Sequence, residues 1–286
     1  FSNGYAEGNK WTVPEVDARI TSGWFWGNGK STPKSMEQLA NMYFSSVGRN
    51  APLLLNIPPN NKGTVDDAIL NRVKEFGNAV KETFTNNIAA GKNVSCTASE
   101  VRGNDIAYSP NNVLDGNQDT YWTTDDKTEA TEATLEVNLG ETKQFDVVSI
   151  EETIKFGQRI SEFKVEYKNG SDEWKVFGSG KTVGAKRLCR RSPVKADKLR
   201  ITVKTSEKAE HKAPIISEVG VYRAAADFAL GNGIPEGLEI IEDTSKDFTF
   251  SGSWGNDTGE AYTGGTGRWA NPGNGTEATV KFKGTK

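Results

Sequence analysis

Two carboxylates near the start of the sequence are candidate catalytic residues. Glu15 and Asp17 belong to the run WTVPEVDARITSGWFW, residues 11–26, which also holds Arg19 and three tryptophans. On a strand, residues i and i+2 face the same side with Cβ atoms roughly 6.5 Å apart, because each residue rises ~3.3 Å. Carboxylate pairs that hydrolyse glycosidic bonds use separations in this range. The alternative is that one carboxylate pairs with Arg19 and the other caps a turn.

The tryptophans of this run indicate a polar pocket. Tryptophan is costly to expose and a carboxylate is costly to bury unpaired, so their mixture is typical of a pocket wall. Trp24 and Trp26 could stack on sugar faces. They could also pack beneath the helix that follows, and we expect one tryptophan in each role.

A second candidate site is the run LDGNQDTYW, residues 114–122. A tight turn there gathers a carboxylate, a Thr hydroxyl and several backbone carbonyls, the oxygen ligands that calcium prefers. A plain Asp-Gly hairpin turn is the alternative. Glu218 favours the metal, because a returning strand could supply the last carboxylate.

Histidine and cysteine are too few for other common sites. The sequence has one histidine, His211, which argues against a His-based catalytic dyad or a multi-His zinc site. Cys96 and Cys189 cannot form a CxxC motif. They are either two buried free thiols or one disulfide within the middle of the chain.

The elements that position these residues begin with two βα units in residues 1–86. A helix is predicted from a Thr32 cap and Pro33 to Gly48, and a second from Thr64, with Asp67 three residues on. Between them, residues 51–57 form an apolar run typical of a parallel strand buried on both faces. Two such units predict a parallel sheet or barrel. They cannot close an eight-stranded barrel, so we expect the N-terminal part to be missing.

The rest of the chain is predicted to be all-β. Residues 87–225 contain short alternating runs, including 133–139, 145–150 and 198–203, which indicate an antiparallel sandwich or jelly roll of about eight strands. Residues 226–286 read as a Gly-rich linker and about four further strands, too few to close a sandwich. We therefore expect a truncated third β domain.

Composition excludes several classes of function. The 286 residues carry 35 Lys and Arg against 38 Asp and Glu, and neither sign is clustered, so nucleic acid or an anionic membrane is not an expected partner. No apolar run approaches the ~20 residues of a membrane span. Low cysteine with 30 Gly and 7 Trp fits a bacterial secreted or cell-surface protein. The sequence shows no initiator Met or signal peptide, so we expect a processed or truncated piece.

Residues 1–84 resemble a known enzyme family. WTVPEVDARITSGWFW, SVGRNAPLLLNIPPNNKG and the helices after them are similar to the C-terminal end of the catalytic barrel of glycoside hydrolase family 29, the α-L-fucosidases. The similarity is to the bacterial subgroup that acts on α-1,3/4-linked fucose. The resemblance implies an Asp nucleophile and a Glu acid/base upstream, hence no catalytic residue in this chain. It also implies that Trp24 packs against fucose and that Glu15 lines the pocket.

The middle of the chain resembles the discoidin-type (F5/8 C) module, similar to carbohydrate-binding module family 32. The similarity rests on AYSPNNVLDGNQDTYWTT, FGQRISEFKVEY, GAKRLCR and IISEVGVY. It implies a structural calcium ion held by Leu114, Asp115, Asn117, Thr120 and Glu218, with Leu114 and Asn117 using backbone carbonyls. Sugar-binding members usually carry a His, an Arg and an aromatic residue in apical loops. Around His211 no Arg–aromatic trio is evident, so docking against the barrel is an alternative role.

These observations predict a multidomain α/β plus all-β protein: the last βα units of a (β/α)8-like barrel, a calcium-stabilised sandwich and part of another β domain. Its expected function is part of an exo-acting, retaining α-L-fucosidase whose partners are fucosylated glycans and the N-terminal remainder of the same protein. The alternative is a non-catalytic carbohydrate-binding or adhesin protein that uses the discoidin-type module.

Overall fold

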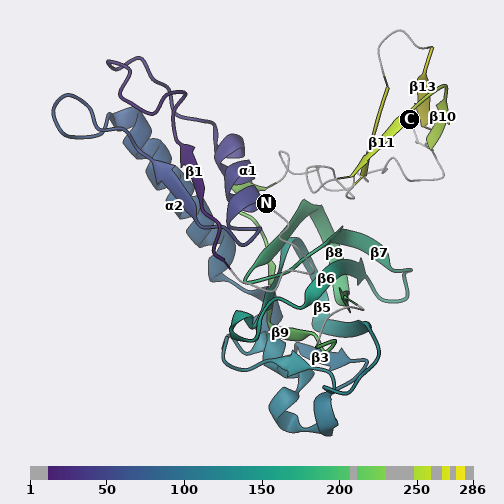
Figure 1. The fold of residues 1–286 in the computed structure, drawn as a ribbon. Coiled ribbons are helices and arrows are strands. Elements are labelled where there is room, and N and C mark those ends of the chain that lie inside the picture. Colours follow the sequence, from purple (N-terminus) through teal and green to yellow (C-terminus); the bar gives the residue numbers. More distant parts are fainter. Residues whose placement is uncertain (1–11, 207–210, 230–247, 259–265, 271–274, 281–286) are drawn as a thin grey trace. The chain divides into compact units, whose positions relative to one another are not determined.

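A computed structural model describes residues 12–206, 211–229, 248–258, 266–270 and 275–280 (Figure 1). The chain divides into two compact units, Phe1–Gly233 and Ile234–Lys286. The first unit contains an α/β part followed by a large antiparallel sheet, and the second contains short strands.

The α/β part consists of β1 (Val16–Arg19), α1 (Met36–Ser46), β2 (Leu53–Asn56) and α2 (Asp67–Thr85). β1 and β2 pair in parallel, with Val16 opposite Leu53. Because a helix separates the two strands, this pairing is the crossover that the sequence pattern predicts. The two βα units and their parallel pairing are confirmed.

The start of α1 differs from the prediction. Its N-cap is Ser35, whose hydroxyl accepts from the backbone N–H of Gln38, while the Gln38 side chain accepts from the N–H of Ser35. Thr32 is therefore not the cap. Pro33 instead forms a β-bridge with Thr21, which keeps the chain extended before the helix.

The start of α2 also differs. Asp66 is the N-cap residue, without a side-chain cap bond, and Thr64 lies outside the helix. The Thr64 hydroxyl and backbone N–H both donate to Oδ1 of Asn60. The predicted Thr64 cap is wrong, because these bonds place Thr64 in the turn before α2 and the helix begins only after Asp66.

Among the residues that the structure describes, the strand β2 is covered on one face only. Ile20, Leu39 and Ile69 form a small core, with Leu55 packed against it. Leu54 points the other way and is 53% exposed, because no described element packs over that face. The predicted burial on both faces is therefore not observed in the described residues.

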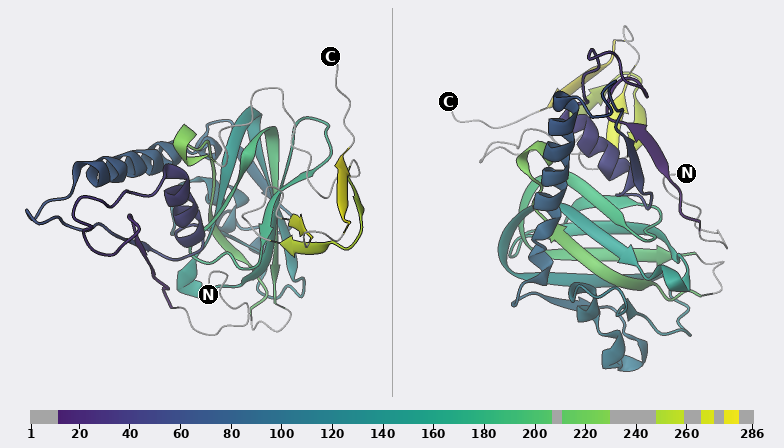
Figure 2. Two further views of the ribbon diagram at one scale, coloured as in Figure 1. Left: turned by 90° about the horizontal axis from the view of Figure 1, so that it is seen from above. Right: turned by 90° about the vertical axis from the view of Figure 1, so that its left-hand side faces the viewer.

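The large sheet confirms an antiparallel β domain, and its seven described strands are close to the expected count of about eight. Its strands are β3 (Ser95–Ala98), β4 (Trp122–Thr123), β5 (Glu132–Glu152), β6 (Ile160–Lys168), β7 (Lys175–Gly180), β8 (Arg187–Thr205) and β9 (Ile215–Tyr222). The order is β4-β9-β5-β8-β6-β7, with β3 paired to β5. Figure 2 shows the strands of this sheet, in teal and green, side by side. The predicted runs 133–139 and 145–150 are one long strand, β5, whose register against β8 shifts between them.

This bent strand explains how one sheet encloses a core. The first half of β5 pairs with β3 and its second half with β9, while β8 accompanies both halves. Trp122, Phe145 and Phe163 are fully buried or nearly so in the resulting core. Cys96 and Cys189 lie in it as free thiols, and burial raises the pKa of Cys96 to about 12. The free-thiol alternative is thus the one observed.

A second apolar cluster joins the α/β part to the sheet. Phe44 of α1, Val147 of β5 and Phe228 share this cluster. Phe228 ends the short helix η6 (Ala226–Phe228), and its ring centroid lies 5.4 Å from that of Phe44 and 5.9 Å from that of Phe76. The segment just after the sheet therefore packs back onto α1 and α2.

The second unit contains β10 (Phe248–Ser251), β11 (Gly255–Thr258), β12 (Thr266–Trp269) and β13 (Glu277–Val280). β10 pairs with β13 and β11 with β12, both antiparallel. The described residues of this unit thus contain four strands, and about four were expected from the sequence. Most of the predicted linker lies outside the described residues.

Candidate functional site

Trp24 lies in the loop that follows β1, beside the carboxyl ends of β1 and β2. The Asn56 side-chain amide, at the end of β2, donates to the Trp24 carbonyl oxygen over 2.9 Å. The Arg19 guanidinium lies 5.6 Å from the centroid of the Trp24 ring. Both contacts hold the loop, and 42% of Trp24 remains exposed. An indole that is fixed but accessible is suited to stack on a ligand.

Trp26 serves a different purpose. Its indole N–H donates to Oδ2 of Asp66 over 2.8 Å, and the Asn60 amide donates to Oδ1 of the same carboxylate. This triad ties the loop after β1 to the start of α2. The expectation that one tryptophan packs the following structure fits Trp26.

The candidate carboxylates lie at the other end of β1. Glu15 precedes the strand and is exposed, as is Asp17. Glu15 and the loop carrying Trp24 are separated by the whole strand, roughly 13 Å at ~3.3 Å per residue. Within the described part of the chain, Arg19 stacks on Trp24 and forms no ion pair with either carboxylate. The structure therefore does not bring Glu15 and Trp24 together, and the pocket role of Glu15 stays a prediction. Trp11 lies outside the described residues.

The predicted calcium loop follows the short helix η4 (Pro110–Leu114). Asp115 organises it: one carboxylate oxygen accepts from the N–H of Asn117 over 2.8 Å and the other from the Thr120 hydroxyl over 2.7 Å. The same hydroxyl also donates to the Asn117 carbonyl over 2.8 Å. Gly116 has a positive φ of 74°, which closes the turn. The loop oxygens are thus held close together.

Glu218 of β9 completes this group across more than a hundred residues of sequence. The backbone N–H groups of Asn117 and Gly116 lower the pKa of its carboxylate, while its Oε1 atom is buried without a hydrogen-bond partner. Burial, followed by the nearby charges of Asp115 and Glu151, raises the pKa of Glu218 to about 7. A buried oxygen without a donor beside a second carboxylate is the environment that a cation would stabilise.

The donor set suits a hard cation and no softer metal. Among the described residues, no group of three or more His, Cys, Asp and Glu side chains could hold a metal ion. A calcium site here would instead combine the Asp115 and Glu218 carboxylates with the Thr120 hydroxyl and the carbonyls of Leu114 and Asn117. Such mixed oxygen sets are typical of calcium.

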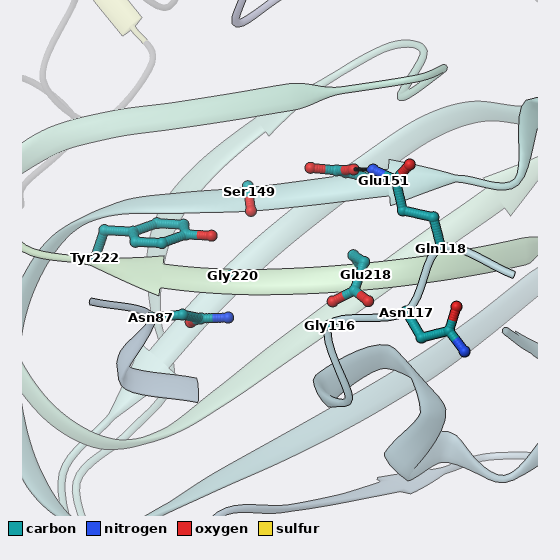
Figure 3. A pocket seen from close by; sticks show the side chains of 9 residues that line it. All are labelled: Asn87, Gly116, Asn117, Gln118, Ser149, Glu151, Glu218, Gly220 and Tyr222. Atoms are coloured by element: carbon teal, nitrogen blue, oxygen red, sulfur yellow. Dashed lines mark hydrogen bonds between the residues drawn. The ribbon is translucent and has the colours of Figure 1, made fainter. Parts of the chain in front are cut away.

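An open pocket of about 530 Å³ adjoins this group (Figure 3). Its floor is the β5–β9 ladder, in which Ser149 pairs with Gly220 and Glu151 with Glu218. Gly220 leaves room that a side chain would fill, because a Cβ there would lie 2.4 Å from the Tyr222 hydroxyl oxygen and 2.5 Å from Ser149 Oγ. The calcium loop and Asn87 form the sides. The sequence did not reveal this pocket, whose residues come from four separate segments.

A cluster of aromatic and arginine side chains lies on the loops of the sheet, and sequence reasoning missed it. The Arg102 guanidinium lies 5.0 Å from the Tyr108 ring centroid, Tyr108 lies 5.6 Å from Tyr121, and Tyr121 lies 5.5 Å from Phe156. Arg159 donates to the carbonyl of Ala213, two residues after His211. We name Arg102, Tyr108, Tyr121, Phe156 and Arg159 the loop cluster. The sequence showed no Arg–aromatic group around His211, and these residues form one across two connections, β3–β4 and β5–β6.

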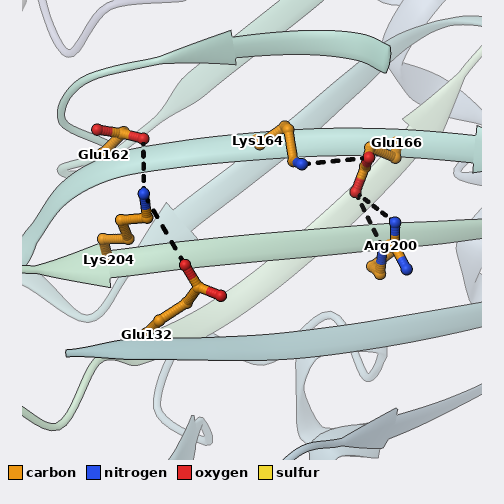
Figure 4. A network of polar contacts seen from close by, with 6 residues as sticks. All are labelled: Glu132, Glu162, Lys164, Glu166, Arg200 and Lys204. Atoms are coloured by element: carbon orange, nitrogen blue, oxygen red, sulfur yellow. Dashed lines mark hydrogen bonds and ion pairs between the residues drawn. The ribbon is translucent and has the colours of Figure 1, made fainter. Parts of the chain in front are cut away.

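Charged side chains on the surface of β5, β6 and β8 form ion pairs with one another, and we assign no site to them. Lys204 lies between Glu162 and Glu132, and Arg200 and Lys164 both pair with Glu166 (Figure 4). Trp174 nearby is covered by the Arg200 guanidinium, 4.4 Å from its ring centroid. Such cross-strand pairs stabilise a sheet surface rather than bind a ligand.

No helix among the described residues is long and apolar enough to span a membrane.

Comparison with known proteins gives two likenesses. Residues 95–219 match the model of the F5/8 type C domain family. Over 218 residues, 75% of this chain, the sequence is 36% identical to alpha-L-fucosidase 1 of Arabidopsis thaliana. The chain spans 41% of that relative's length.

Two solved structures extend the likeness. A Ruminococcus gnavus GH29 fucosidase in complex with fucose is 54% identical, with a TM-score of 0.74 over 79% of this chain and 44% of that one. The structure of SpGH29 is 34% identical, with a TM-score of 0.69 over 78% and 46%. Coverage of this size exceeds the F5/8 type C match, so the likeness includes other parts of the chain. Residues 95–219 are thus similar to F5/8 type C domains, and the chain is similar to GH29 α-L-fucosidases.

Proposed function

We propose that this chain is the C-terminal part of a retaining α-L-fucosidase that removes terminal α-1,3/4-linked fucose from glycans, with the catalytic Asp and Glu upstream of residue 1. The observation that carries the proposal is 54% identity, over 79% of the chain, to a fucosidase solved with fucose. In such a reaction one carboxylate forms a covalent glycosyl-enzyme and the other acts as acid and then base.

Trp24 supports this proposal from its position. Ligand sites of α/β barrels lie at the carboxyl ends of the strands, and Trp24 sits in the loop that follows β1 at that edge. The exposed Leu54 on β2 supports it too, because further barrel strands would cover that side chain. The proposed contribution of this chain is one wall of the fucose pocket, with Trp24 against the sugar.

The F5/8 type C domain would bind calcium through Leu114, Asp115, Asn117, Thr120 and Glu218. The buried Oε1 of Glu218 and its raised pKa support a bound cation. The ion would neutralise the Asp115 and Glu218 carboxylates and fix the loop between them. We further propose a bacterial protein that is secreted or carried on the cell surface.

The test compares this chain with the whole protein that contains it. With 4-nitrophenyl α-L-fucoside as substrate, the whole protein should release 4-nitrophenol and the 286-residue chain alone should release none. Product analysis early in the reaction should show retained configuration. Measurable release by the chain alone would contradict the placement of the carboxylates, and a whole protein inactive on fucosides would contradict the function.

The loop cluster favours a second function, carbohydrate binding by the F5/8 type C domain. Phe156 is 44% exposed, and arginines lie beside the tyrosines of the cluster. Aromatic faces with adjacent donors are suited to sugar rings. In a glycan array on the chain, binding that is lost in Phe156→Ala and retained in Trp24→Ala supports this function. Absence of binding at array concentrations opposes it.

A further inference from the structure

Glu151 is a buried carboxylate next to the proposed calcium site. It lies on β5 with 7% of its surface exposed, directly opposite Glu218 of β9 in the strand register. Side chains opposite each other on neighbouring strands have Cβ atoms ~5 Å apart, so the two carboxylates are neighbours on the same face. Two like charges placed this close would repel each other unless a cation or a hydrogen bond compensates them.

Both oxygens of Glu151 have defined partners. Oε2 accepts from the side-chain amide of Gln118 over 2.9 Å, and Oε1 pairs with the Lys186 ammonium over 2.8 Å. Gln118 belongs to the calcium loop itself, between Asn117 and Thr120 (Figure 3). Glu151 therefore anchors the loop to strand β5 through Gln118. Its other oxygen pairs with Lys186.

The charges around the site are unequal. Asp115 and Glu151 both act electrostatically on Glu218, and Lys186 pairs with Glu151. A divalent ion between Asp115 and Glu218 would feel the negative charge of Glu151 and, farther away, the positive charge of Lys186. Removal of either charge should therefore change calcium affinity, and the two removals should act in opposite directions.

We propose that Glu151 is a positioning residue of the calcium site, which anchors the calcium loop through Gln118 and supplies negative potential beyond the ligands themselves. The inference rests on the calcium site proposed above. Groups that hold metal ligands from outside typically change metal affinity by 10–100-fold when removed. Glu151→Gln should weaken calcium binding about tenfold, and Gln118→Ala should weaken it less, because it removes the anchor without changing the charge.

Lys186→Met is the decisive variant, because its effect on calcium affinity should have the opposite sign to that of Glu151→Gln. The variant leaves Glu151 in place and removes a nearby positive charge, so calcium should bind more tightly than in the wild-type chain. If Glu151 mattered only for folding, Glu151→Gln would lower the melting temperature equally in calcium and in chelator. It would then leave the calcium affinity unchanged. Glu162→Gln and Lys204→Met are matched controls, because this exposed ion pair joins β6 to β8 and includes no residue of the calcium loop (Figure 4).

The experiment titrates calcium chloride into the 286-residue chain by calorimetry, with melting temperatures in calcium and in chelator. Glu218→Gln should abolish binding, and the control variants should bind as the wild type does. A wild-type chain that binds no calcium would contradict the site itself. Binding that is lost in Glu218→Gln but unchanged in Glu151→Gln, or that weakens alike in Glu151→Gln and Lys186→Met, would overturn the role of Glu151 alone.

Discussion

The backbone N–H of Lys186 donates a hydrogen bond to the side-chain oxygen of Asn50 over 2.8 Å, although 136 residues separate them. The Asn50 amide nitrogen donates in turn to the carbonyl of Val183 over 2.8 Å. Asn50 follows α1, and Val183 and Lys186 precede β8. One side chain thus bonds the α/β part to the sheet at two backbone positions. A Cβ at Gly184, which lies between them, would be 2.6 Å from the Asn50 oxygen, so this contact requires glycine.

Asn50→Ala should lower the free energy of unfolding by about 2–3 kcal/mol. Two partly buried backbone groups lose their partners, and alanine tolerates the φ of 70° less well than asparagine. Urea unfolding at neutral pH measures the effect. Asn50→Gly is the matched control: it loses the same hydrogen bonds without the backbone strain and should fall between wild type and Asn50→Ala. Equal stability of all three proteins would contradict the bridging role.

Phe228→Ala should cost about 3–5 kcal/mol, the usual loss for a fully buried aromatic side chain. Phe228 is completely buried against Tyr43, Phe44 and Phe76, so its truncation would open a cavity between the sheet and the two helices. Thermal unfolding followed by circular dichroism provides the measurement. Phe25→Ala is the control, since Phe25 is 86% exposed and its loss should change stability by less than about 0.5 kcal/mol. Similar melting temperatures for both variants would show that this cluster does not stabilise the fold.

Stability should fall as pH rises through the range in which Glu152 titrates. Burial raises the pKa of Glu152 from 4.5 to about 7. Hydrogen bonds from the N–H groups of Arg159, Gly184 and Ile160 lower this pKa but do not outweigh burial. The folded protein therefore retains a proton that the unfolded chain releases above its lower pKa. The associated free energy is present below pH ~4.5 and is lost by pH ~7, with a total of about 3 kcal/mol at most.

Glu152→Gln should flatten this pH dependence. Because the pKa of Glu218 is also raised to about 7, the comparison belongs in a Glu218→Gln background, where only Glu152 distinguishes the two proteins. Urea unfolding between pH 4 and 8 would give the two profiles. Parallel profiles would show that Glu152 has the same pKa in the folded and unfolded states.

In the whole protein, Trp24→Ala should lower kcat/KM for an aryl fucoside by ~10–100-fold, because a stacking surface for the sugar is lost. Arg19→Ala should have a smaller effect, since its guanidinium only lies against the indole. Phe25→Ala, next in the chain, is the control and should retain wild-type kinetics. If Phe25→Ala and Trp24→Ala were equally impaired, the loop as a whole and not the indole would be responsible.

Sequence reasoning worked best where the relevant residues are close along the chain. The apolar spacing from Met36 through Phe44 predicts α1, and its length was correct to within a few residues. The helix start was wrong because Thr32 and Ser35 are both good caps, and the choice depends on the bridge between Thr21 and Pro33. The oxygen-rich loop around Asp115 was found because its donors and acceptors lie within six residues.

The loop cluster and the Glu151 contacts could not be found in this way. Tyr108 and Tyr121 belong to the connection between β3 and β4, and Phe156 belongs to the connection between β5 and β6. Each alone is typical of a surface aromatic residue. Glu151 looks like an ordinary polar position of an alternating strand until its pairing with Lys186 and Gln118 is seen.

The sequence by itself determined the local elements, the change from βα units to an antiparallel sheet and the oxygen-rich loop around Asp115, because these depend on short-range periodicity and turn chemistry. Only the tertiary structure decided which distant groups meet: Glu218 with Asp115, Asn50 with Lys186, and Phe228 with the two helices. Strand register and the bend of β5 bring these pairs together, and both arise from packing across the whole sheet rather than from neighbouring residues.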